Sequence, residues 1–132
     1  MNFMVTLITD GTGMEGMPSE ERDEFARRMG EFMSEIQQAG VLLHTDALGP
    51  VSDARTLRRK SGKVVVTDGP FAETKEQLGG FCLIDCEGPE DAMAWAKKVP
   101  LGPGGSIEVR AVKDLTPYGY RDVGVGTVQA EG

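Results

Sequence analysis

The chain has 132 residues, which is enough for one domain with a hydrophobic core of its own. Its formal net charge of −7 argues against a protein that binds nucleic acid directly through phosphate contacts. No apolar run is long enough to span a membrane, and no basic and apolar leader opens the sequence, so we expect a cytoplasmic protein.

The first part of the chain is expected to form a strand, a helix and a second strand. Residues 3–8 are apolar and rich in strand formers. Ser19 suits the N-cap of a helix because acidic residues follow it in the first turn, and Gly40 suits the end of that helix. The apolar residues in between recur at helical spacing: Phe25, Met29, Phe32, Met33 and Ile36. A second strand is expected over residues 41–48.

The middle of the chain predicts a β-hairpin. Two short strands are expected over residues 54–59 and 63–67, around a turn at residues 60–62. The first of these strands is basic in an otherwise acidic chain. Because few aromatic residues lie among the basic ones, a solvated hairpin is favoured over a nucleic-acid patch.

The last part of the chain repeats the strand–helix–strand order. A strand is expected over residues 80–86 and another over residues 106–113. Pro89 suits the first position of the intervening helix, and Pro100 stops it. The residues expected to face inward on this helix are Ala92, Trp95, Ala96 and Val99.

The order of elements indicates an α+β fold. Two β-α-β halves give a ferredoxin-like βαββαβ subunit, here with an inserted β-hairpin, in which both helices cover one face of an antiparallel sheet. The other face would be bare and partly apolar, which soluble proteins rarely allow. We therefore expect a homodimer in which the two sheets pack face to face. The domain spans residues 1–113, and the tail over 114–132 either frays or forms an arm laid on the partner chain.

Cys82 and Cys86 are the only cysteines. Four residues apart on one strand, they would be separated by about 13 Å, which excludes a disulfide within the chain. With a single histidine elsewhere they also make a poor metal site, so no metal is expected.

His44 is the sole histidine, and strict alternation along its strand would place Leu42, His44, Asp46 and Leu48 on one face. The Cα atoms of His44 and Asp46 would then lie about 6–7 Å apart. That spacing suits an imidazole oriented by a carboxylate, the usual partnership of a general base. The alternative is a half-exposed histidine at the dimer seam.

The segment from Thr67 to Phe81 combines turn formers, charges and a double glycine between two apolar strands. Its turn formers alone could serve only to reverse the chain, and its charges could form surface ion pairs. The residues that could instead meet a ligand are Asp68, Phe71, Glu73, Lys75, Glu76 and Gly80. The chain has no phosphate-binding loop, dinucleotide fingerprint or nucleophile elbow, so no cofactor is expected.

Residues 63–81, Lys-Val-Val-Val-Thr-Asp-Gly-Pro-Phe-Ala-Glu-Thr-Lys-Glu-Gln-Leu-Gly-Gly-Phe, closely resemble the YCII-related family, in particular its DGPF branch. The resemblance extends to residues 3–5, 39–42 and 105–110, and covers about residues 3 to 113. It implies a ferredoxin-like subunit that pairs into a dimeric α+β barrel.

The resemblance also bears on the site. A histidine–aspartate pair has been suggested as catalytic in the wider family, with the histidine on the first helix, but residues 20–36 contain no histidine here. Asp68 is the acidic position that carries over from the motif. Members of the DGPF branch also resemble partners of extracytoplasmic-function sigma factors by genomic association.

Two functions follow from these observations. The first is a small organic ligand bound in the cleft between two sheets, with or without catalysis. Asp68 would orient the ligand or act as acid and base, His44 would carry a proton, Phe71 would form an apolar wall, and Lys75 would meet an anionic group. This hypothesis predicts that Asp68, Phe71 and His44 line one pocket. The alternative is a non-catalytic accessory protein of a sigma factor.

Overall fold

The computed structural model describes residues 1–10, 16–71 and 75–120. The expected elements are present, with ends that differ by up to three residues from those expected. They are β1 (Asn2–Thr9), α1 (Ser19–Gln38), β2 (Leu42–Ala47), β3 (Arg55–Lys60), β4 (Lys63–Asp68), β5 (Gln77–Asp85), α2 (Pro89–Lys98) and β6 (Ser106–Ala111). The structure adds two short 3-10 turns that were not expected, η2 (Val51–Asp53) and η3 (Thr116–Tyr118).

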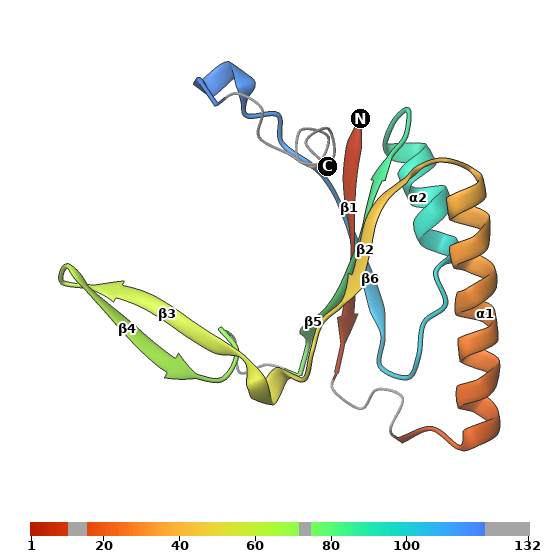
Figure 1. Cartoon of the computed structure of the whole chain (residues 1–132), viewed down its shortest axis with the longest axis horizontal. Coiled ribbons are helices and arrows are strands. Elements are labelled where there is room, and N and C mark those ends of the chain that lie inside the picture. The colour runs from red at the N-terminus through yellow and green to blue at the C-terminus, as the bar shows by residue number, and fades with distance from the viewer. Residues whose placement is uncertain (11–15, 72–74, 121–132) are drawn as a thin grey trace.

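Four strands form the main sheet in the order β2-β5-β1-β6, and every neighbouring pair is antiparallel. Both helices cover the same face of this sheet (Figure 1). This strand order, with a helix after the first strand and another after the third strand of the sheet, confirms the ferredoxin-like arrangement. The face turned away from the helices is called the open face below.

The hydrophobic core lies between the helices and the sheet. Its buried residues come from β1, β5, both helices and the end of α2: Phe3, Val5, Phe32, Ile36, Cys82, Ile84, Ala92, Ala96 and Val99. The stripe expected on α1 therefore supplies two buried side chains, Phe32 and Ile36. The inward residues expected on α2 are confirmed, with Trp95 packed at the edge of the core.

Helix α1 differs from expectation at its start. Pro18 occupies the N-cap position, Ser19 is the first helical residue, and no side chain among the described residues caps the helix. Proline fixes an extended backbone that leads directly into the helix, so Ser19 does not have to fill that position. At the other end Gly40 adopts a φ of 73°, the left-handed geometry that terminates helices.

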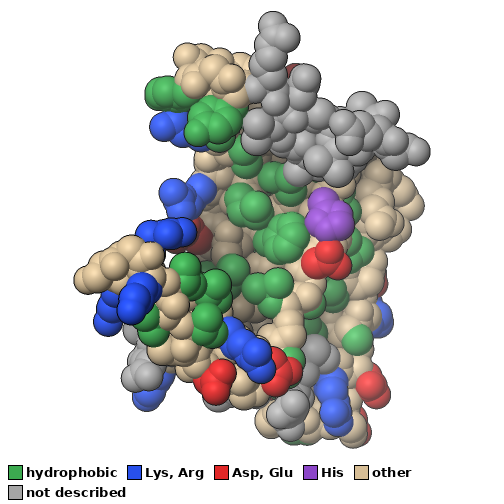
Figure 2. Space-filling model, turned by 60° about the vertical axis from the view of Figure 1, so that its left-hand side comes forward, with side chains coloured by type: hydrophobic (Ala, Val, Ile, Leu, Met, Phe, Trp, Pro, Cys, Tyr) green, Lys and Arg blue, Asp and Glu red, His purple; other side chains and the backbone are tan. Residues whose placement is uncertain are grey.

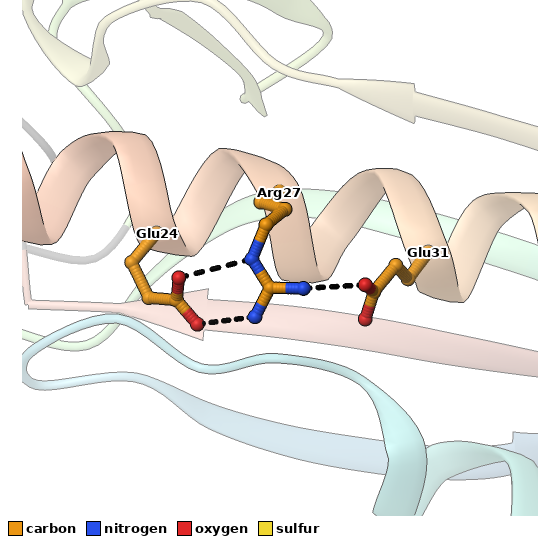
Figure 3. Close-up of polar contacts among 3 residues, drawn as sticks. All are labelled: Glu24, Arg27 and Glu31. Carbon is orange, nitrogen blue, oxygen red and sulfur yellow. Dashed lines mark hydrogen bonds and ion pairs between the residues drawn. The ribbon is translucent and has the colours of Figure 1, made fainter.

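The outer face of α1 carries surface ion pairs. Arg27 bonds Glu24 one turn before it, at 3.0 Å from its Nε, and Glu31 one turn after it (Figure 3). The hydrogen bond from Arg27 lowers the pKa of the Glu24 carboxyl. Because these side chains are exposed, the pairs add little stability and mark a solvated surface rather than a site.

Strands β3 and β4 form a separate two-stranded sheet. Ser61 and Gly62 adopt φ values of 50° and 79°, so the hairpin closes through a two-residue turn with both central residues left-handed, as in type I′ turns. The hairpin projects away from the main sheet on the side of the open face, and the chain after β6 also runs out on that side (Figure 1).

The double glycine allows close packing within the sheet. A Cβ atom built on Gly80 would lie 3.0 Å from the backbone oxygen of Asp46, and one on Gly79 would lie 3.0 Å from the side chain of Thr9. The close neighbours at these two positions are thus the adjacent strands β2 and β1.

We therefore expect Gly80→Ala to lower the free energy of unfolding by about 1–3 kcal/mol, because the added methyl group would push on a strand backbone. Gly30→Ala is the matched control: Gly30 is exposed within α1, and a methyl group added there would meet nothing within 4 Å outside the backbone of its own helix. This control should stabilise the protein by about 0.5–1 kcal/mol. Urea denaturation of both variants measures the difference, and equal effects would contradict this role for Gly80.

Candidate functional site

The open face is defined by strand register. Phe3 and Val5 point into the core, so Met4 and Thr6 point to the opposite side. Residues that face each other across antiparallel strands lie on the same face of the sheet. The open face therefore carries two rows, His44–Leu83–Met4–Arg110 and Asp46–Phe81–Thr6–Glu108.

Apolar and ionisable side chains share this face. Figure 2 shows apolar side chains gathered there, beside the histidine and with basic residues of the hairpin region to one side. Leu83 is buried, while Met4 and Phe81 are half-buried. Near the hairpin, Leu48 and Leu78 are exposed. The sequence contains a signal for this surface, because apolar Met4, Phe81 and Leu83 alternate along β1 and β5 with the residues that face the core.

His44 and Asp46 form the best-defined polar pair on the open face. Nε2 of His44 lies 2.7 Å from Oδ2 of Asp46, and both side chains are exposed. The imidazole ring stands 5.7 Å from the ring of Phe81. This confirms that the two side chains share one face, and it supplies the geometry of an imidazole held by a carboxylate next to an aromatic wall.

Strict alternation is broken just before this pair. The register between β2 and β5 shifts between Leu42 and His44, and Leu42 pairs with Ile84 and packs against the core. The prediction that Leu42 shares a face with His44 is therefore wrong. An extra residue at a bulge rotates the rest of the strand, so His44 turns to the open face while Leu42 stays inside.

Asp68 and Phe71 lie near the base of the hairpin. The Asp68 side chain is 93% exposed, and its Oδ1 is 3.7 Å from Nε of Arg55. Phe71 is 77% exposed; the guanidinium of Arg58 lies 5.2 Å from its ring centre and donates a 3.3 Å hydrogen bond to its carbonyl oxygen. Phe71 borders an open hollow of about 560 Å³ between the hairpin base and the β2 end, together with Leu48, Pro50 and Leu78.

The prediction that Asp68, Phe71 and His44 line one pocket is not met within a single chain. The hollow beside Phe71 contains neither Asp68 nor His44. The cause is the hairpin: it projects from the sheet, so Asp68 at the end of β4 is carried away from the open face where His44 lies (Figure 1).

The other candidate ligand contacts from the motif differ in their solvent exposure. Lys75 and Glu76 are exposed. Glu73 lies outside the described residues. Gly80 is buried against β2, where the absence of a side chain serves strand packing.

A second hollow, of about 390 Å³, opens on the helix side of the sheet. Thr45 lies beside it and donates a 2.8 Å hydrogen bond to the carbonyl oxygen of Phe81, with its Oγ1 3.3 Å from Sγ of Cys82. Burial raises the pKa of the Cys82 thiol, so this sulfur is a poor nucleophile. Thr45 stands between His44 and Asp46 in the chain and faces the opposite side of the sheet from them, as alternation along the strand predicts. The rest of this hollow is mostly core surface, including Met29, Phe32 and Val99.

The two cysteines are free thiols, as expected from their spacing. Among the residues that the structure describes, no cluster of three or more His, Cys, Asp or Glu side chains is arranged to hold a metal ion. Within the same residues, no helix is both long and apolar enough to cross a membrane.

Comparison of the sequence with known proteins identifies the family of this chain. The family model described as "YCII-related domain" matches residues 1–116. The chain is also 38% identical over 119 residues to "Uncharacterized protein R00369" of Rhizobium meliloti (strain 1021), which covers 89% of this chain and 96% of that protein. The match spans the main sheet, both helices and the hairpin, and the chain therefore belongs to the YCII-related family.

Proposed function

We propose that this protein is a homodimer whose two open faces cover each other and enclose a cleft for a small organic ligand. The support is the composition of the open face, where Met4, Phe81 and Leu83 form an apolar strip that neither α1 nor α2 covers. Two sheets packed face to face lie about 10 Å apart, and side chains from both faces interdigitate in that gap, so the cleft would lie where those side chains leave it unfilled. Apolar walls with a few convergent polar groups are the usual make-up of ligand sites.

The observation that carries the proposal is the contact between His44 and Asp46. Imidazole is the side chain that takes up and releases a proton near neutral pH, and a carboxylate on one ring nitrogen leaves the other free to face a ligand. The 2.7 Å contact fixes the ring beside Phe81. Such a pair suits a ligand with an acidic or basic group attached to an apolar body, and it can move a proton to or from that group.

This proposal gives the residues at the hairpin base a smaller role in ligand binding than the sequence predicts. Asp68, Phe71 and Lys75 are exposed in the single chain, so they would contribute to the cleft only at its entrance. His44 and Asp46 are the residues we assign to proton transfer and ligand orientation. Asp68 stays a candidate for contact with the ligand as it enters.

Substituting Asp46 tests the ligand site. We expect Asp46→Asn to weaken the binding of ionisable fragments by about tenfold or more, because a charge-assisted hydrogen bond contributes roughly 1.5–3 kcal/mol. A library of small aromatic and aliphatic acids and amines, screened by saturation-transfer NMR, supplies the probes. Asp91→Asn is the matched control, since Asp91 is an exposed aspartate on α2, on the helix side of the sheet. Unchanged binding in Asp46→Asn would contradict the proposal.

An accessory protein of an extracytoplasmic-function sigma factor is the second candidate. Exposed Tyr118 and Tyr120, which follow the last strand, favour a protein partner because aromatic residues are enriched at interfaces. A sigma factor captured equally well by the wild type, His44→Gln and Asp46→Asn, and lost on Tyr118→Ser, would support this candidate. Capture that requires His44 would count against it.

A further inference from the structure

We propose that the β3–β4 hairpin is an arm that packs against a second copy of this chain. The inference rests on the dimer proposed above and adds a second contact to it. It is carried by three features of the hairpin: an exposed apolar face, a positive charge in an acidic chain, and its direction.

The hairpin lacks packing of its own on one face. Register pairs Leu57 with Val66 and Arg59 with Val64, so Leu57, Val64 and Val66 share that face. These three side chains are 64%, 53% and 55% exposed, respectively. A two-stranded hairpin is only marginally stable in water unless its apolar face is covered, so a partner surface is needed to hold it.

The opposite face already contacts its own chain. Thr56 is buried, and its hydroxyl donates a 2.9 Å hydrogen bond to the carbonyl oxygen of Gly69. Arg58, on the same face, reaches the ring and the carbonyl oxygen of Phe71. The segment after β4 therefore folds back on this face. The face with Leu57, Val64 and Val66 is the one left for an occupant.

Charge favours a second copy as that occupant. The hairpin over residues 55–68 carries five basic residues and one acidic residue, a formal charge of +4. The whole chain carries −7, so the remainder carries −11. In a two-fold dimer each positive arm would meet the negative body of the other copy, and this attraction acts twice.

The direction of the hairpin also favours a second copy of this chain as its partner. The hairpin extends from the open side of the sheet, which is the side that the proposed partner covers (Figure 1). Basic side chains flank apolar ones around the hairpin (Figure 2). An arm with apolar residues between cations fits a protein surface that is apolar and acidic better than a bare phosphate backbone, which offers no apolar surface.

The test compares two neighbouring valines. Val66→Asp places a charge on the exposed face, whereas Val65→Asp makes the same change on the face toward Thr56 and Arg58. Sedimentation of the full chain over a range of concentrations gives the dimer dissociation constant. We expect Val66→Asp to raise it at least tenfold and Val65→Asp to change it less than threefold. An aspartate could unfold the hairpin, so Val66→Thr and Val65→Thr, which keep the β-branched shape, provide a second comparison. We expect Val66→Thr to raise the dimer dissociation constant more than Val65→Thr does.

The outcomes separate the arm from the dimer itself. If the wild type is a dimer and both valine substitutions change its dissociation constant equally, or neither changes it, the proposal that the hairpin is an arm is overturned. The proposed face-to-face dimer is then left intact. A wild-type monomer overturns both. A short DNA or RNA duplex that binds the wild type, loses binding on Lys60→Glu and leaves the dimer constant unchanged would assign the hairpin to nucleic acid and also overturn the arm.

Discussion

Replacing Ile84 with alanine should lower the free energy of unfolding by about 2–5 kcal/mol, the usual cost of removing a large aliphatic side chain from a closed core. Ile84 is fully buried on β5, which pairs with both β1 and β2. It faces Phe3 across one strand pair and Leu42 across the other. The cavity would therefore lie at the junction of three strands, where neither neighbour can move in without breaking the register.

The control for this variant is Val112→Ala. Val112 is about half exposed just after β6, so its truncation should cost about 0.5 kcal/mol or less. Urea denaturation at one fixed protein concentration measures both, because dimer formation would make stability depend on concentration. A loss below about 1 kcal/mol for Ile84→Ala would contradict the tight packing inferred for this core.

Replacing Thr6 with arginine should abolish the dimer without unfolding the chain. Thr6 lies on a central strand of the open face, between Phe81 and Glu108. In a single chain the new guanidinium can reach solvent. Between two packed sheets it would be buried as a charge, which costs several kcal/mol and raises the dimer dissociation constant by about 100-fold or more.

Gln37→Arg is the matched control for Thr6→Arg. Gln37 is exposed near the end of α1, on the helix side of the sheet, so the same added charge should leave the dimer intact. Sedimentation equilibrium measures the dissociation constants, and far-UV circular dichroism verifies the fold. A Thr6→Arg variant that stays dimeric would contradict the face-to-face arrangement while leaving the subunit fold untouched.

Much of the fold could be predicted from the sequence because its elements carry strong local signals. The apolar stripe of α1 has helical spacing over five residues, Pro89 and Pro100 bound α2, and Ser61–Gly62 matches a hairpin turn. Because the order β-α-β occurs twice, only a few arrangements of the strands in the sheet are then compatible with the sequence. The predicted N-cap differs from the observed one by one residue because Pro18 and Ser19 both suit a helix start, and only backbone geometry separates them.

The site was harder to predict because its residues depend on long-range geometry. His44 and Asp46 could be paired from their spacing on one strand, but the bulge that turns Leu42 inward leaves no mark in the sequence. The direction of the hairpin sets where Asp68 and Phe71 lie, and no periodic pattern in the sequence indicates that direction. The sequence leaves open whether Gly80 lies close to a ligand or to a neighbouring part of the protein, and in the structure its close neighbour is the backbone of β2.

Native mass spectrometry of the wild-type protein, purified without added ligand, tests the central claim most directly. One chain has a mass of 14.2 kDa. We predict a dimer of 28.4 kDa, twice the mass of one chain, that carries the extra mass of a small organic molecule. We also predict that Asp46→Asn keeps the dimer and loses that extra mass. A bare monomer of 14.2 kDa would contradict both the covered open face and the cleft that it encloses.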